Sequence, residues 1–261
     1  MRRYAPVTSG IASDGTSIFF VTGNTKASAS AGFSSPATYG DGEAVYKLGT
    51  TLARPSATRD YFAPSNWAAL DQSDTDLGGT GVILFDVPGA TPSSLVLALG
   101  KDGNAYLLDR TNLGGVGGTP VATRKVANGT IIQAGAAYTT PQGSYFVFRG
   151  SVTGCPGGTS GGLMAVKVGA TSPPTLTPAW CAGPTTAGNA IVSLSDAQGD
   201  DAIVWFVGSD NRLYAVDADT GASVLTGAAI TLGTVKPHQT PIVANGRVFV
   251  ASDSRIFALT P

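Results

Sequence analysis

The sequence is short of charge, of glutamate and of histidine. Charged residues make up 13% of its 261 residues, and 16 Lys and Arg nearly balance 17 Asp and Glu, for a net charge of −1. Binding to a phosphate backbone needs a clustered basic surface, so we expect no nucleic acid among the partners. Glu43 is the only glutamate, whereas helix surfaces favour Glu and Lys. This composition argues against a helical bundle, a coiled coil and a doubly wound fold.

Long apolar runs are also missing. No segment approaches the ~20 apolar residues that a membrane-spanning helix needs, and the two arginines near the N-terminus precede no apolar stretch of a signal peptide. We therefore expect either a cytoplasmic chain or a natural N-terminus upstream of Met1. The single histidine, His238, builds neither a metal site nor a triad alone and is most simply a loop residue.

Cysteine is scarce as well. The two cysteines, Cys155 and Cys181, are too few to make a zinc site by themselves. The low charge and the abundance of Gly, Ser and Thr suit an exported protein, in which such a pair forms a disulfide. The sequence leaves the disulfide and two free thiols equally open.

Glycine and apolar residues, by contrast, are plentiful. There are 35 glycines, and 43% of the residues are hydrophobic, which argues for a packed core and against disorder. One phrase recurs along the chain: an apolar strand, a turn containing Asp, and a second apolar strand. It occurs at residues 94–109, 202–217 and 246–259, with degenerate copies at 17–48 and 144–168. In the clearest copies, Asp102-Gly103 and Asp210-Asn211 predict two-residue hairpin turns whose central positions tolerate positive φ.

The spacing of these hairpins predicts the fold. Units of four short strands that recur about every 40–50 residues are typical of a β-propeller. We expect an all-β chain, a β-propeller of four-stranded antiparallel blades with about five blade units. These form either a complete ring or part of a seven- or eight-blade ring. No linker divides the sequence, so we expect residues 1–261 to form a single domain that is incomplete at its N-terminus. Only residues 64–71 predict a helix, with Ser65 as its cap.

The densest polar segment is residues 70–79, which contains Asp71, Asp74 and Asp76. Three carboxylates this close repel one another unless a cation or water screens them, and oxygen-rich loops suit Ca²⁺. The segment lacks the glycine and the distal glutamate of an EF-hand. A solvated turn, with Asp76 capping a strand, is the simpler interpretation.

Taken in order, several segments resemble the quinoprotein family of pyrroloquinoline quinone (PQQ)-dependent alcohol dehydrogenases, and chiefly the second half of that propeller. The resemblance is carried by residues 20–24, 39–45, 71–76, 101–110 and 208–221. It implies that Asn24 and Asp74 bind Ca²⁺, that Asp74 is the catalytic base, and that Lys101 approaches the PQQ oxygens. In such a site Ca²⁺ acts as a Lewis acid, the carboxylate takes the substrate proton and the ammonium stabilises charge on the reduced cofactor.

The resemblance also has gaps. Ser73 stands where the family has Trp, the vicinal cysteine pair has no counterpart, and no glutamate precedes Glu43. No Trp precedes Trp67, although the family places one beneath the quinone. The chain is therefore expected to be either a fragment of the enzyme or a relative that keeps the scaffold without the cofactor.

Two functions follow from these alternatives. The first is a PQQ- and Ca²⁺-dependent dehydrogenase that oxidises an alcohol or a sugar. It would need an external electron acceptor, because the sequence has no haem attachment motif. The second is a non-catalytic, exported PQQ-like repeat protein that binds a protein or glycan partner or supports assembly. The resemblance implies a periplasmic or secreted location for both.

Overall fold

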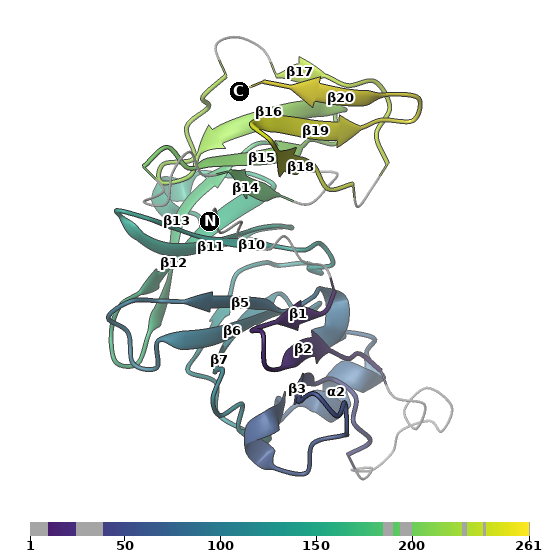
Figure 1. The fold of residues 1–261 in the computed structure, drawn as a ribbon, viewed down its shortest axis with the longest axis vertical. Helices are drawn as coiled ribbons and strands as arrows, with labels where there is room; N and C mark the ends of the chain where they lie inside the picture. Colours follow the sequence, from purple (N-terminus) through teal and green to yellow (C-terminus); the bar gives the residue numbers. More distant parts are fainter. Residues whose placement is uncertain are drawn as a thin grey trace. The chain divides into compact units, whose positions relative to one another are not determined.

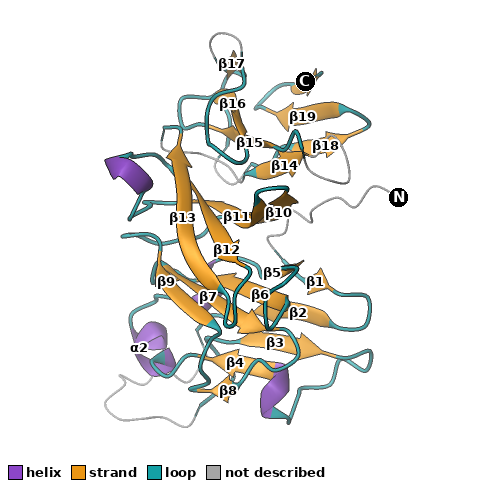
Figure 2. Cartoon of the chain, turned by 90° about the vertical axis from the view of Figure 1, so that its left-hand side faces the viewer, coloured by secondary structure: helices purple, strands orange, loops and turns teal. Residues whose placement is uncertain are grey.

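The computed structural model describes residues 10–24, 39–184, 190–193, 200–225, 229–236 and 239–260. His238 lies outside these residues. The described chain is built almost entirely of strands (Figure 2), and its only α-helix, α2 (Trp67–Gln72), is short. Single 3-10 turns occur at Thr58–Asp60, Leu77–Gly79 and Pro156–Gly158. No helix among the described residues has the length and apolar character needed to cross a membrane.

The chain divides into two compact units, one of Thr8–Ile132 with Gly169–Leu176 and one containing Gln133–Val168 and Thr177–Pro261. The first unit holds two sheets (Figure 1). One has the order β1 (Ala12–Ser13), β2 (Ile18–Val21), β3 (Val45–Leu48), β4 (Tyr61–Ala63) and β8 (Gly115–Val116), and only the β4–β8 pairing is parallel. The other is antiparallel, with the order β5 (Ile83–Asp86), β6 (Ser94–Leu99), β7 (Asn104–Asp109) and β9 (Ala122–Lys125).

Three sheets belong largely to the second unit. The first has the order β10 (Ala136–Thr140), β11 (Gly143–Arg149), β12 (Leu163–Gly169) and β13 (Thr175–Ala182). The next has β14 (Ile191–Ser193), β15 (Ile203–Val207), β16 (Arg212–Asp217) and β17 (Ile230–Thr231). The last, called here the C-terminal sheet, has three strands in the described residues: β18 (Ile242–Ala244), β19 (Arg247–Ala251) and β20 (Ile256–Leu259).

The recurring phrase forms one hairpin in each sheet. The clear copies are β6–β7, β15–β16 and β19–β20, and the degenerate copies are β2–β3 and β11–β12. The prediction of an all-β fold of the β-propeller class is therefore confirmed. Of the five sheets in the described residues, three have the four antiparallel strands expected of a blade. The expectation of one domain over residues 1–261 stays a prediction.

The hairpin turns differ from those expected. Only the second residue of each predicted pair has positive φ, at 75° for Gly103 and 63° for Asn211. The amide of Gly103 donates to the carbonyl of Gly100, and the turn spans four residues rather than two. In the first turn, Asp102 Oδ1 also accepts the amide of Asn104 at 3.0 Å. Both turns, residues 100–103 and 208–211, are closed by a backbone hydrogen bond between their first and last residues.

Strand β15 carries a continuous apolar run because its sheet is covered on both faces. On β15, Val204 and Phe206 enter one buried cluster, while Trp205 and Val207 enter another. In the first unit, Phe19 and Phe62 of one sheet pack in a cluster with Val96 and other residues of the next sheet. The predicted helix forms, but it begins after Asn66, whose side chain makes no capping hydrogen bond, and Ser65 is not its cap. Cys155 and Cys181 form a disulfide.

Candidate functional site

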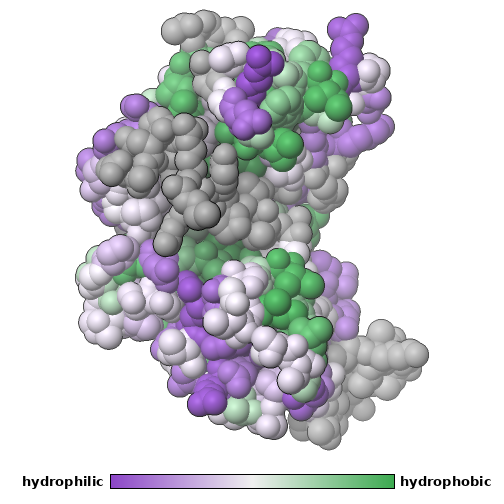
Figure 3. All heavy atoms as spheres, in the orientation of Figure 1, coloured by the Kyte–Doolittle hydropathy of each residue, from purple (hydrophilic) through white to green (hydrophobic). Residues whose placement is uncertain are grey.

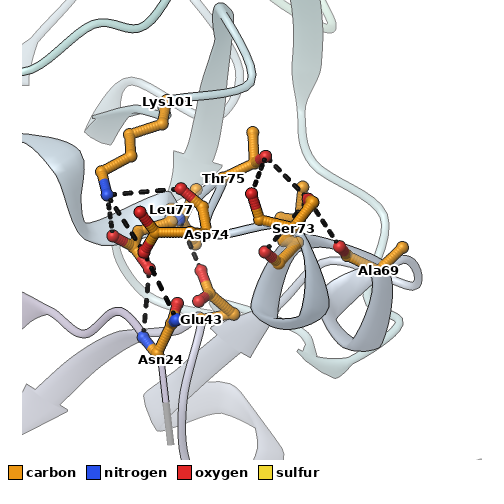
Figure 4. Close-up of polar contacts among 10 residues, drawn as sticks. Asn24, Glu43, Ala69, Ser73, Asp74, Thr75, Leu77 and Lys101 are labelled. Atoms are coloured by element: carbon orange, nitrogen blue, oxygen red, sulfur yellow. Dashed lines mark hydrogen bonds and ion pairs between the residues drawn. The ribbon is translucent and has the colours of Figure 1, made fainter. Parts of the chain in front are cut away.

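Four segments of the first unit bring their polar residues together beyond the ends of the strands (Figure 4). Asn24 follows β2, Glu43 precedes β3, Asp76 follows α2, and Lys101 follows β6. Backbone hydrogen bonds fix these segments to one another. The amide of Lys101 donates to the carbonyl of Asp76 at 2.8 Å, and the amide of Glu43 donates to the carbonyl of Gly23 at 3.0 Å. We call Asn24, Glu43, Asp76 and Lys101 the polar cluster.

Lys101 is the cation of the polar cluster. Its Nζ makes a close ion pair with Asp76 and lies 3.5 Å from Asp74 Oδ1 and 3.3 Å from the Asp74 carbonyl oxygen. The Lys101 and Asp76 side chains are 21% and 16% exposed, whereas the Asp74 side chain is 77% exposed. The hydrogen bond to Asp76 raises the Lys101 pKa above its usual value. Lys101 is therefore held charged, with Asp76 as its main partner and Asp74 at the solvent edge.

Glu43 is the buried acid of the cluster. It has no exposed surface, and its Oε2 accepts the backbone amide of Leu77 at 2.5 Å. The Glu43 pKa is raised to about 7, chiefly by burial and in part by the nearby charge of Asp76, while the hydrogen bond from Leu77 acts in the opposite direction. A carboxyl group removed from water beside a second carboxylate favours its protonated form.

Asn24 connects the carboxylates. With one orientation of its amide, Nδ2 donates to Asp74 Oδ1 at 3.4 Å. The opposite orientation lets Nδ2 donate to Glu43 Oε1 at 3.1 Å and to Asp76, which satisfies more groups. The Asn24 backbone amide also donates to Asp76 Oδ1 at 3.2 Å. Asp76 is thus bound from two sides, by Asn24 and by Lys101.

Glycines allow the segments to approach this closely. A Cβ on Gly78 would lie 2.6 Å from the carbonyl carbon of Thr22, and one on Gly79 would lie 2.5 Å from the carbonyl oxygen of Ile131. A Cβ on Gly23 would lie 3.0 Å from the Asp76 carboxylate. These distances are shorter than van der Waals contact, so the Asp76 loop fits against the segment after β2 and against Ile131 only because these positions lack side chains.

The structure brings together the three predicted site residues, Asn24, Asp74 and Lys101, within hydrogen-bond or ion-pair distance. Their catalytic and cofactor-binding roles stay predictions. The sequence did not point to Glu43 and Asp76 as the centre of the cluster. Two signals were available: Glu43 is the only glutamate of the chain, and Asp76 precedes the Gly78-Gly79 pair that permits the close approach.

The donor set of the cluster does not fit a calcium ion. An ammonium already lies between Asp74 and Asp76, and the buried Glu43 accepts a backbone amide. Across the described residues, no group of three or more His, Cys, Asp or Glu side chains is arranged to hold a metal ion. Hard cations take several oxygen ligands at once, and here the positive partner is supplied by Lys101.

Comparison with known proteins gives structural neighbours only. No family model matches the sequence, and no curated protein matches it. BamB from Moraxella catarrhalis is 12% identical with a TM-score of 0.45, and the match covers 98% of this chain and 59% of BamB. The β-propeller domain of Cps50 (Swd1) from Myceliophteria thermophila is 16% identical with a TM-score of 0.39, over 83% of this chain and 61% of that one. The chain therefore spans less than two thirds of the length of either protein.

Proposed function

We propose that this chain is part of an exported, non-catalytic quinoprotein-like propeller that acts as a binding or assembly scaffold for a protein or glycan partner. One observation carries the proposal. Where the family resemblance implies cofactor and calcium, the ammonium of Lys101 is bonded to Asp76 and Asp74. Asp76 is held by both Lys101 and Asn24, so the polar cluster joins these loops as an internal clamp.

The disulfide supports export. Cys155 and Cys181 are bonded, and the described residues contain no free cysteine. Disulfides persist in oxidising compartments such as the periplasm and the extracellular space, and they are rare in the cytosol. The location was expected from the resemblance and the composition, and the bonded pair adds an independent physical reason for it.

A dehydrogenase fragment is the second candidate, because Asn24 and Lys101 lie within hydrogen-bond or ion-pair distance of Asp74, and the resemblance assigns these three residues to one site. Titration of the purified chain with PQQ, with and without CaCl₂, separates the two. The scaffold proposal expects no binding that depends on Ca²⁺ and no dye-linked oxidation of alcohols or sugars. Micromolar PQQ binding that requires Ca²⁺ and is abolished by Asp74→Ala would overturn it.

The stability of two variants provides a test without cofactor. In a vacant cation site the carboxylates repel one another, so neutralising one raises stability. If the polar cluster is a clamp, Asp76→Asn removes the main partner of Lys101 and leaves a part-buried ammonium without it. This should lower the free energy of unfolding by about 1–3 kcal/mol. Asp74→Asn is the matched control, because its exposed ion pair contributes about 0–1 kcal/mol. Urea unfolding of both variants distinguishes a clamp from a cation site. An increase in stability with Asp76→Asn would contradict the clamp.

A further inference from the structure

One part-buried cation of the second unit has no partner in the described chain. Arg149 is the last residue of strand β11, in the middle of the sequence. Its Nε is buried and has no hydrogen-bond partner among the described residues, and none of their ion pairs includes it. Burial lowers the pKa of this guanidinium below its usual value. An arginine keeps its charge even so, and here that charge is not balanced by a carboxylate.

The other part-buried cations of the described residues each have a partner. Lys101 makes a close ion pair with Asp76. Arg110 lies 2.9 Å from Asp86, and the Nζ of Lys47 donates to the Arg110 carbonyl oxygen at 3.3 Å. A charge withdrawn from water without a counter-ion destabilises a fold. The guanidinium at the end of β11 therefore departs from the pattern of the chain, and it is available to an anion from outside.

The position of Arg149 keeps its guanidinium partly out of water. Arg149 pairs with Leu163 of β12, and directly paired residues of an antiparallel sheet share a face. Leu163 lies in the buried cluster that also holds Phe206 of β15, so Arg149 extends between these two sheets, which lie side by side in Figures 1 and 2. The segments here pack closely: the amide of Gly162 donates to the carbonyl of Gly183 at 3.3 Å, and a Cβ on Gly183 would lie 2.6 Å from the Phe206 ring.

The surroundings of Arg149 suit a ligand with a single negative charge. The loop that follows it, residues 150–162, contains no charged residue, and the disulfide between Cys155 and Cys181 fixes this loop to β13. The loop exposes glycine and hydroxyl groups, in contrast to the hydrophobic surface over β18–β20 in Figure 3. A planar guanidinium matches the two oxygens of a carboxylate in shape and charge.

From this we infer that Arg149 is a binding residue for a carboxylate group supplied by another molecule. The carboxylate approaches the guanidinium from its exposed side, while the stem of Arg149 lies on the face of the buried cluster. Partial burial makes this ion pair stronger than one at a fully exposed arginine. A free carboxylic acid and a glutamate side chain carry the same group, and the test separates these two sources. The inference goes beyond the proposed function and does not depend on it.

Nuclear magnetic resonance of the ¹⁵N-labelled chain tests the inference at the group itself. The Nε–H signal of Arg149 is identified by its loss in Arg149→Lys. The chain is titrated with sodium acetate and with an end-blocked tripeptide that has glutamate at its centre. The same tripeptide with glutamine and an equal concentration of sodium chloride are the controls. We expect this signal to shift saturably with a carboxylate and not with either control.

The two carboxylates distinguish the sources of the group. A shift with both indicates a site that accepts an acidic side chain, whereas a shift with acetate alone indicates a site for a small free acid. Each result supports the carboxylate site. The absence of a shift with both carboxylates would overturn the inference, and so would an equal shift with sodium chloride, because that would reflect general screening of charge.

Two variants complete the test. Arg149→Met retains a long apolar stem without the charge, so it should raise the dissociation constant roughly tenfold or more, measured at the backbone amides of the loop. Its urea midpoint should stay unchanged or rise, because an unbalanced charge is removed. Arg255→Gln is the matched control: Arg255 is exposed and belongs to no ion pair of the described residues, and the variant should bind like the wild type. Equal losses of binding in the two variants, or a lower urea midpoint for Arg149→Met, would contradict the inference.

Discussion

The indole Nε1 of Trp180 donates to the carbonyl oxygen of Ala218 at 2.7 Å, which joins strand β13 to the segment after β16. The phenol of Tyr138 donates to the same oxygen at 2.6 Å. Trp180 and Tyr138 are both buried, so a single backbone carbonyl links two neighbouring sheets through two aromatic side chains. Nearby, the Thr140 hydroxyl donates to Asp219 at 2.6 Å and extends the link.

This shared acceptor predicts non-additive stability. Trp180→Phe and Tyr138→Phe should each lower the free energy of unfolding by about 1 kcal/mol, because the carbonyl keeps one donor. The double variant leaves a buried carbonyl without either donor, so its loss should exceed the sum of the two single losses. Urea unfolding measures all three. Tyr214→Phe, which removes an exposed hydrogen bond to Asp210, is the control and should change stability little.

Glu43 predicts a pH dependence. Its pKa is raised from 4.5 to about 7 in the folded chain. Between these values the folded state holds a proton that the unfolded state has released, so stability falls as pH rises from about 4.5 to about 7 and then levels, by about 3 kcal/mol in total. Glu43→Gln keeps an acceptor for the Leu77 amide and should remove this slope. Urea unfolding below, within and above the window checks this, and an unchanged slope rules Glu43 out as its source.

The close packing around Gly78 leads to a prediction that no side chain is tolerated at this position. Gly78→Ala would place a Cβ 2.6 Å from the Thr22 carbonyl carbon and 2.8 Å from the Gly23 nitrogen. Both contacts are backbone atoms, which cannot rotate away, so we expect a loss of about 1–3 kcal/mol. Gly49→Ala is the matched control, since its Cβ would meet no atom within 4 Å. Thermal unfolding of both variants is the measurement, and equal melting temperatures would contradict the close packing of the Asp76 loop.

The disulfide predicts sensitivity to reductant. Cys155 and Cys181 are 26 residues apart, and closing a loop of that length removes unfolded-chain entropy worth about 3 kcal/mol. Dithiothreitol should lower the urea midpoint of the wild type. A variant with both cysteines replaced by serine should start at the lower midpoint and show no response to reductant. A wild type whose midpoint does not change on full reduction would show that the cross-link adds no stability.

Much of the fold could be predicted because it depends on local patterns in the sequence. The five hairpins, the strand-rich composition and the near absence of helix follow from apolar runs separated by Asp and Gly, and the structure has all of them. Local pattern was less reliable at the turns. The turns at Asp102 and Asp210 have four residues rather than the two expected, and a backbone hydrogen bond closes each of them. The cap of helix α2 also differed from the prediction, because Asn66, not Ser65, takes the flanking position.

The sequence by itself determined the strands, the repeat and three of the residues that meet at the candidate site, because apolar periodicity and motif order are properties of the linear chain. Only the tertiary structure decided that Asp76, rather than Asp74, is the main partner of Lys101, and that Glu43 is buried beneath them. It also decided that Cys155 and Cys181 are bonded and that the C-terminal sheet leaves Ile242 and Ile256 uncovered. Each of these depends on which segments, distant in the sequence, meet in space, and on how much water is left between them.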